Sequence, residues 1–176
     1  MRIAALFAVA LILPCFAAKI DNPEYQSWSK FGVGSMVEYT VQSEAAGTKT
    51  ESTMTVTMVE KTDDKIVLET KTKMVVAGNE MTMPAQKRDV PAKVDQPEQQ
   101  AQDGPKPEEG KEDVEAAGKT LSCKTTTTVT ESNGMKTTAK IWQCDDVPGG
   151  MVKMTAKTEG SVSSQTEQNL TKMEAK

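Results

Sequence analysis

Apolar and polar residues alternate along most of this chain, with the period of two that is typical of half-buried β-strands. Val37, Tyr39 and Val41 alternate with polar residues in the first such run. Turn sequences rich in Gly, Asp and Pro separate the runs. The pattern predicts strands over residues 35–42, 53–58, 65–76, 119–131, 135–145, 151–159 and 164–173. We therefore expect a mainly β protein, an antiparallel open or half-closed barrel.

One short segment near the N-terminus has a helical pattern instead. Asn22-Pro23-Glu24 supplies an N-cap, a proline at the first helical position and an acidic residue in the first turn. Tyr25, Trp28 and Phe31 follow at roughly helical spacing. The segment predicts a helix over residues 23–31 whose aromatic face plugs one end of the sheet.

Residues 84–117 differ in kind from the rest of the chain. They contain five prolines among Gln, Lys, Glu and Asp, and very few large apolar residues. Such a composition favours a disordered insert on the surface, because it buries too little apolar area to offset the entropy of ordering. The expected organisation is a first β half with the short helix over residues 18–83, the insert over 84–117, and a second β half of the same domain over 118–176.

The first 17 residues resemble a secretory signal peptide. Arg2 precedes an apolar run from Ile3 to Leu13 that is too short to anchor in a bilayer, and a cut after Ala17 leaves small residues at both recognition positions. Cys15 follows Pro14, whereas lipidation signals carry a small residue there. We expect an exported protein, periplasmic or secreted, with no transmembrane segment in the mature chain.

Removal of the leader takes Cys15 with it and leaves Cys123 and Cys144 as an even pair. Asn133-Gly134 between them is a strong hairpin signal, because both residues tolerate the positive φ of a type I′ turn. A two-residue loop at this point places the two cysteines directly opposite each other, at a non-hydrogen-bonded pair within disulfide range. In an oxidising compartment this predicts a Cys123–Cys144 disulfide.

A hairpin register shifted by one residue is a real alternative. It needs a three-residue loop with a bulge at Gly134, and it brings Leu121 and Val129 to the side of Ala139 and Ile141. The shifted register matches apolar residues better, but it points the two sulfurs to opposite faces. The pattern alone leaves the two registers open.

Composition excludes several functional classes. The chain has 176 residues, only 37% of them hydrophobic and 4% aromatic, so its core is thin. A net charge of −4 offers no basic surface for nucleic acid. Because the chain contains no His, the commonest general base and zinc ligand are missing. The pair Asp145-Asp146 is predicted to be a turn with solvated carboxylates. We expect no enzymatic activity, no metal and no cofactor.

Several methionines lie at positions where the alternation predicts the apolar side of a strand. Met side chains on the predicted apolar faces of different strands form a flexible surface that can repack around varied apolar ligands. Simple filling of the core is the other interpretation. The candidate ligand-facing residues are Met54, Val56, Met58, Ile66, Leu68, Met74 and Met154.

The segment from Ile141-Trp142 through Pro148-Gly149-Gly150 to Lys153 is similar to a stretch found in uncharacterised exported bacterial β proteins, for which no activity is implied. The overall layout, over residues 23–173, resembles the half-barrel fold of periplasmic lipoprotein carriers and related lipid-binding proteins. This resemblance implies a curved sheet that holds acyl chains against a helix, and it implies no particular functional residue.

Two functions are consistent with these observations. The first is a non-enzymatic binding protein that holds a lipid or another hydrophobic ligand on the curved sheet. The alternative is a structural or protein-interaction module of the cell envelope, which would use exposed sheet edges or the insert as contact points. A cavity too large to be core would favour the first.

Overall fold

The computed structural model describes residues 19–76, 79–95, 105–132, 134–161 and 163–176. It contains one helix, α1 (Pro23–Ser29), and is otherwise built from strands. The strands of the first half are β1 (Lys19–Asp21), β2 (Met36–Ala45), β3 (Thr48–Lys61), β4 (Lys65–Val76), β5 (Asn79–Thr82), β6 (Gln86–Pro91) and β7 (Lys93–Asp95). The strands of the second half are β8 (Glu108–Ala116), β9 (Lys119–Ser132), β10 (Met135–Gln143), β11 (Met151–Glu159) and β12 (Ser164–Glu174).

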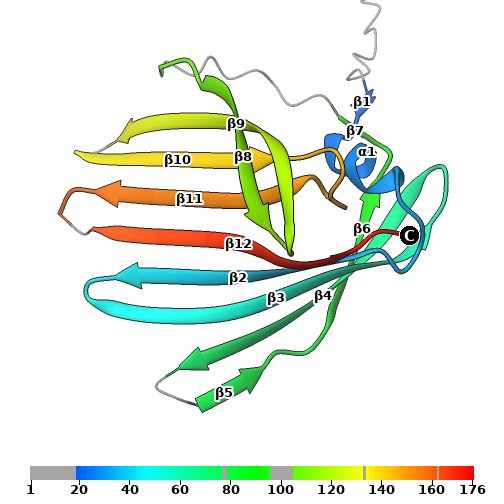
Figure 1. The fold of residues 1–176 in the computed structure, drawn as a ribbon, viewed down its shortest axis with the longest axis horizontal. Coiled ribbons are helices and arrows are strands. Elements are labelled where there is room, and N and C mark those ends of the chain that lie inside the picture. The colour runs from blue at the N-terminus through cyan, green and yellow to red at the C-terminus, as the bar shows by residue number, and fades with distance from the viewer. Residues whose placement is uncertain (1–18, 77–78, 96–104, 133, 162) are drawn as a thin grey trace, which may run out of the picture.

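One large antiparallel sheet holds most of these strands. Its order is β5-β4-β3-β2-β12-β11-β10-β9-β8, with β6 pairing the first part of β4. Each half of the chain forms a run of hairpins, and the two runs join where β12 pairs with β2 (Figure 1). The sheet does not close, since β5 and β8 at its two ends do not pair in the part of the chain described. The expectation of a mainly β, antiparallel, open or half-closed barrel with one short helix is confirmed.

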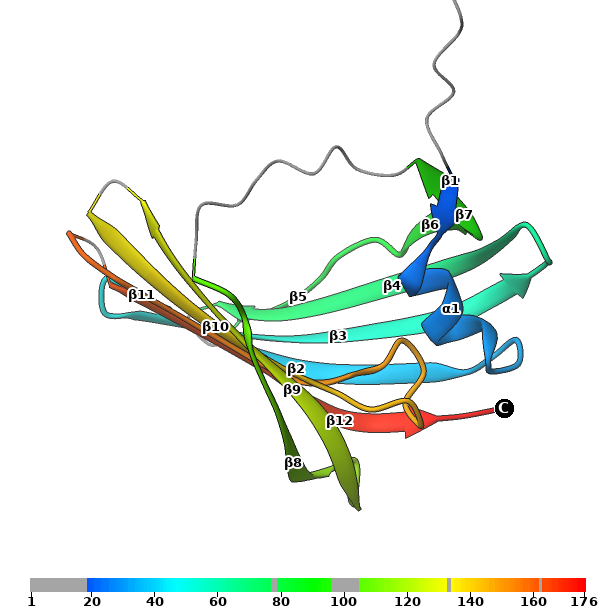
Figure 2. The same cartoon turned by 90° about the horizontal axis from the view of Figure 1, so that it is seen from above.

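The helix packs against one end of this sheet. Asn22 Oδ1 accepts a hydrogen bond from the backbone N–H of Glu24 at 3.0 Å, so the predicted N-cap is present, and the helix ends at Ser29, two residues earlier than expected. Figure 2 shows β2, β3 and β4 arcing around α1. Trp28 lies on the inner side of the helix and is buried, and Tyr25 and Phe31 pack against the same core. The three aromatic residues therefore plug one end of the sheet, as their spacing predicts.

The core lies between α1 and the strands that arc around it. Met58 and Leu68 of neighbouring strands face each other across the β3–β4 pair, and both are fully buried. A β-bulge in β3 between Met58 and Glu60 adds a bend at this point. The buried apolar residues of this end are Trp28, Val37, Tyr39, Met58, Ile66, Leu68, Val90, Val147, Val152 and Leu170.

The expectation of a disordered insert is wrong for much of residues 84–117. Residues 86–91 and 108–116 form β6 and β8, residues 93–95 form β7, and residues 96–104 lie outside the described residues. Composition misses β6 because a strand that pairs with an existing edge needs little apolar area of its own. β6 pairs with β4 along its whole length and buries a single large side chain, Val90.

β8 is the second ordered part of that segment. It pairs with β9 from Glu108 to Ala116. It also contacts β12, although β9, β10 and β11 lie between the two strands in the sheet order. Figure 1 shows β8 and the first half of β9 crossing over β10 and β11. The β8–β9 hairpin therefore folds back over one face of the sheet.

The expected signal peptide over residues 1–17, with Cys15, lies outside the described residues. Within the residues that are described, no helix has the length and apolar character needed to cross a membrane.

Candidate functional site

The pairing of the strands defines two faces of the large sheet. In antiparallel strands, directly paired residues share a face, and successive residues of one strand alternate between faces. We name the side that carries Tyr39 the Tyr39 face and the side that carries Trp142 the Trp142 face. Tyr39 pairs with Met54 and Leu170, whereas Trp142 pairs with Lys153 and Thr125.

The Trp142 face is strongly charged. Its lysines and glutamates form ion pairs between neighbouring strands, such as Lys153 with Glu167 at 2.7 Å and Lys73 with Glu80 at 3.3 Å. A large part of this face is exposed, which is the usual environment for such pairs. Its charged residues in β2, β3, β4, β10, β11 and β12 include Glu38, Glu44, Lys49, Glu51, Glu69, Lys71, Lys73, Lys136, Lys140, Lys153, Lys157, Glu159, Glu167 and Lys172.

The Tyr39 face of the same strands carries no charged side chain over residues 37–45, 48–58, 68–75, 135–142, 151–159 and 164–170. Its residues are apolar or are Ser, Thr and Gln. Strict segregation of charge between the two faces of one sheet is the pattern expected when one face meets water and the other meets apolar matter.

Half of the Tyr39 face is covered and half is not. Towards α1 it forms the core, with Val37, Tyr39 and Leu170 buried. Away from α1, one row of paired residues crosses the sheet next to the core. All residues of this row except Gln168 are half-buried or exposed. This row, the Gln168 row, runs through Met81, Met74, Ser52, Val41, Gln168, Met154, Ile141 and Thr126, from β5 to β9.

Gln168 is the centre of this row and its most buried member. The side chain is 7% exposed, and its Nε2 has no hydrogen-bond partner, the one such buried side-chain atom in the part of the chain that the structure describes. An unpaired buried amide costs about 1–3 kcal/mol. Elsewhere on the same face polar groups are paired across strands, as Ser43 Oγ and Thr166 Oγ1 are at 3.2 Å.

The predicted ligand-facing residues all lie on the Tyr39 face, but the structure divides them into two groups. Met58, Ile66 and Leu68 are fully buried under α1, so they form core and do not reach an open surface. Met54 and Val56 are half-buried and pack against that core, while Met74 and Met154 are half-buried in the Gln168 row. For the first three residues the core-filling interpretation fits the structure and a ligand-facing role does not.

Gln168 is a residue that the sequence analysis missed. The signal that identifies it is the alternation itself, because Gln168 lies two residues before Leu170 and so shares its buried face. A glutamine at an apolar position of a strand is an exception that merits an explanation.

A pocket of 620 Å³ lies elsewhere, at the far ends of β2, β3, β4 and β12. Its lining is mostly from the Trp142 face, including Gln42, Glu51 and Glu167, and none of the predicted ligand-facing residues contributes to it. Several of its polar groups already have partners, since Gln42 Nε2 donates to Glu51 Oε2 at 3.1 Å and Glu167 pairs with Lys153. This pocket therefore offers little unsatisfied chemistry to a ligand.

The β8–β9 hairpin packs over a cluster of interacting side chains on the Trp142 face, in which Trp142 is buried and Glu112 and Lys140 are partly exposed. The indole Nε1 of Trp142 donates to Glu112 Oε2 at 2.7 Å, and Lys140 Nζ lies 4.7 Å from the centroid of the indole ring. The hydrogen bonds from Lys140 and Trp142 hold the pKa of Glu112 below its usual value. Every member of this cluster is paired, which favours a structural role.

The hairpin between the cysteines has the register of the two-residue loop, with Met135 opposite Ser132 and Gln143 opposite Lys124. Leu121 finds an apolar partner outside β10 in this register, because it pairs with Val114 of β8 and is buried on the Trp142 face. The paired ladder stops at Gln143, and the N–H of Cys144 bonds instead to Gly150 in the following turn. Cys123 and Cys144 are both buried free thiols, so the predicted disulfide is not formed in the structure.

Compared with known proteins, the chain matches no family model, no curated protein and no solved structure.

Proposed function

We propose that this protein is a non-enzymatic binding protein that holds a lipid or another hydrophobic ligand on the uncovered half of the Tyr39 face. The observation that carries the proposal is the absence of charge from this face over the described parts of six strands, while the opposite face of the same strands carries Lys and Glu throughout. A sheet with both faces in water gains nothing from this segregation.

The composition of the Gln168 row supports the same function. Met74, Met81 and Met154 are long, unbranched and polarizable, so they can adjust to ligands of different shape. Met81 is 61% exposed at the edge of the sheet, and Met74 and Met154 are half-buried. The row thus offers an apolar surface that has not been filled by the core.

The proposal includes export. The leader-like sequence of residues 1–17 supports a location in the periplasm or outside the cell, where a carrier of hydrophobic molecules would act between membranes. The resemblance of the layout to half-barrel lipid-binding proteins points the same way, towards a curved sheet with a helix at one end.

The first test is native mass spectrometry of the protein purified from the envelope or medium of the organism that makes it. We expect excess native mass that disappears when the same sample is denatured, because a bound ligand leaves with the fold. A bare native mass, together with no binding of the dye described next, would overturn the proposal.

The second test uses the neutral apolar dye N-phenyl-1-naphthylamine and a pair of variants on one strand. Met154→Lys places a charge on the Tyr39 face, whereas Thr155→Lys places the same charge on the opposite face. Because a charge in contact with an apolar ligand must be desolvated, we expect Met154→Lys to weaken dye binding about tenfold or more. Thr155→Lys should leave it unchanged.

A second pair keeps this test decisive if Met154→Lys fails to fold. Met74→Lys in β4 changes the Tyr39 face, and Val75→Lys, at a side chain that is 45% exposed, changes the opposite face. Equal dye affinity in both members of a folded pair would show that the dye does not use the Tyr39 face, and the proposal would fail.

An interaction module is the second candidate, and one observation favours it. β5 lies at an open end of the sheet, and the exposed Met81 sits on it. A strand from another protein could add to this edge by main-chain hydrogen bonds. Capture of a partner by the wild type that is lost in Met81→Lys, with a bare native mass, would favour this candidate.

A further inference from the structure

The unpaired amide of Gln168 calls for a partner that the chain itself does not supply. In folded proteins roughly nine in ten buried polar groups are hydrogen-bonded, because an unpaired one costs free energy. Gln168 is only 7% exposed. Its paired neighbours on the Tyr39 face are Val41 and Met154, and neither has a side-chain oxygen. Because the other members of the Gln168 row are half-buried or exposed, a ligand bound along the row would lie next to this buried amide.

We propose that Gln168 Nε2 donates a hydrogen bond to the uncharged carbonyl oxygen of an acyl ester or acyl amide bound along the Gln168 row. This inference rests on the proposed function and names its ligand class, a neutral acylated molecule. Gln168 would set the position of the carbonyl, and the apolar residues on either side would contact the acyl chain.

The donor chemistry of the site selects an acceptor. The side-chain NH₂ group of glutamine has two hydrogens to donate and accepts nothing. A pure hydrocarbon would leave this group unpaired, so it would not repair the deficit. A ligand with a carbonyl at this depth does repair it.

The charges near Gln168 favour an uncharged acceptor over a carboxylate or phosphate. Lys124 lies beside the β9 end of the Gln168 row and pairs with Asp145 at 3.7 Å. The nearest lysine along β11, Lys153, lies on the opposite face and is held by Glu167 at 2.7 Å. An anion on the Tyr39 face would therefore lose its hydration without gaining a counter-ion, which is costly in a buried site.

The shape of the row suits an acyl chain. Met154 and Ile141 follow Gln168 on the β11 side, and Val41 and Met74 lie on the β4 side, with Ser52 between them. Neighbouring strands are about 4.8 Å apart, so the row extends roughly 10 Å from Gln168 to Ile141 on the β11 side and roughly 14 Å to Met74 on the other.

The test compares two ligands that differ in the carbonyl alone, 1-decanoylglycerol and its ether analogue 1-decylglycerol, by displacement of the neutral dye. We expect the wild type to bind the ester about 3- to 10-fold more tightly than the ether, the range of one net hydrogen bond. Gln168→Met, which keeps the length of the side chain, should bind both ligands equally. Sodium decanoate should bind the wild type more weakly than the ester.

Asn169→Met is the matched control. Asn169 is the next residue of β12, faces the opposite side and donates to Glu167 at 3.1 Å. This variant should keep the preference of the wild type for the ester. A wild type that binds ester and ether equally, or a preference that survives in Gln168→Met, would overturn the inference. In either case the dye still binds, whereas failure of the proposed function means that neither dye nor ligand binds at all.

The stability of the ligand-free protein gives an independent readout. If the amide has no partner in the free protein, Gln168→Met should unfold at the same temperature as the wild type or a higher one. Asn169→Met should unfold at a slightly lower temperature, because it loses a hydrogen bond. A larger loss in Gln168→Met than in Asn169→Met would show that the amide is paired within the free protein and would overturn the inference.

Discussion

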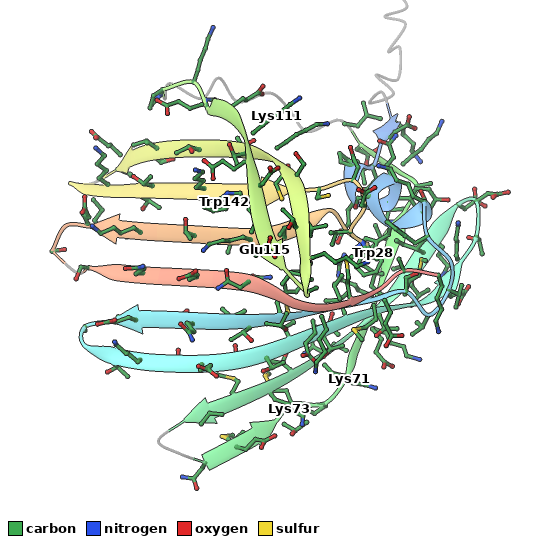
Figure 3. All side chains as sticks on the ribbon, viewed as in Figure 1. Trp28, Lys71, Lys73, Lys111, Glu115 and Trp142 are labelled. Atoms are coloured by element: carbon green, nitrogen blue, oxygen red, sulfur yellow. The ribbon has the colours of Figure 1, made fainter. Side chains whose placement is uncertain are left out.

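Glu112 and Trp142 are joined by a hydrogen bond across an intervening strand. Glu112 lies on β8 and Trp142 on β10, with β9 between them in the sheet, yet the indole Nε1 and the carboxylate Oε2 are 2.7 Å apart. Lys140 Nζ bonds to the other carboxylate oxygen at 2.5 Å. These contacts hold the β8–β9 hairpin against the Trp142 face. Figure 3 shows Trp142 at β10 and β11, beside the crossing β8–β9 hairpin, and Trp28 at the end of the sheet where α1 lies.

The charge of Glu112 should therefore contribute to stability in a pH-dependent way. Its pKa in the folded protein is lowered, chiefly by the hydrogen bonds from Lys140 and Trp142. A lowered folded pKa stabilises the protein above the unfolded pKa, and this contribution is lost as the pH falls through the folded pKa. Glu112→Gln should unfold at a lower urea concentration than the wild type near neutral pH.

The same comparison at acidic pH provides the control. Once Glu112 is protonated, the wild type carries an uncharged side chain there, as the variant does. The difference in urea midpoint should therefore shrink as the pH falls below about 4.5. A difference that stays constant between neutral and acidic pH would contradict an ionic role for Glu112.

Asn22 connects the start of α1 to β6 as well as capping the helix. Its Oδ1 accepts from Glu24 N–H at 3.0 Å, and its Nδ2 donates to the carbonyl of Pro91 at 2.8 Å. Asn22→Ala removes both bonds, and we expect a loss of about 1–2 kcal/mol in the free energy of unfolding. Gln26→Ala, on the exposed side of the same helix, should change it by less than about 0.5 kcal/mol. Equal effects of the two substitutions in denaturant titrations would refute the capping role.

The sequence predicts the parts of this fold that depend on local chemistry. The strands containing Val37 and Val152 follow from alternation, and the helix follows from Asn22-Pro23. These features depend on neighbours within a few residues, so a single sequence contains their full signal.

The parts that escape prediction depend on partners distant in the chain. The β6 strand is ordered by pairing with β4, and Val90 alone marks it as buried. Burial of Leu121 depends on the β8–β9 hairpin folding over the sheet, which alternation cannot indicate. For the same reason α1, which covers Met58 but not Met74, divides the apolar residues of the Tyr39 face into core and open surface.

The two cysteines test the local geometry at the end of β10. Both side chains are buried. Burial raises the pKa of the Cys123 thiol, and the nearby Cys144 raises it further, so little of the Cys123 thiol is ionised near neutral pH. We expect iodoacetamide to label both residues slowly in the folded protein and rapidly after denaturation without reductant. A mass two hydrogens lower, with no labelling after denaturation, would show the disulfide that the hairpin register predicts. Cys144→Ser should then release Cys123 for labelling.

Gly149 lies against Trp28, and this contact explains why the turn after β10 needs glycine at that position. The residue has φ +78, and a Cβ built on it would lie 2.7 Å from the indole Nε1 of Trp28. Gly118 has a similar φ of +73, with nothing within 4 Å of the corresponding Cβ position. Gly118→Ala therefore measures the cost of the backbone conformation alone, about 1–2 kcal/mol.

Gly149→Ala adds a steric conflict with a buried indole to the same backbone cost. Overpacking of this kind costs about 1–3 kcal/mol, so we expect a total loss of about 2–5 kcal/mol in the free energy of unfolding. Because the indole fills the end of the sheet beneath α1, the fluorescence of Trp28 should also shift in Gly149→Ala and stay unchanged in Gly118→Ala. Equal losses in the two variants would mean that the turn moves away from Trp28 at little cost, and that its glycine serves the backbone conformation only.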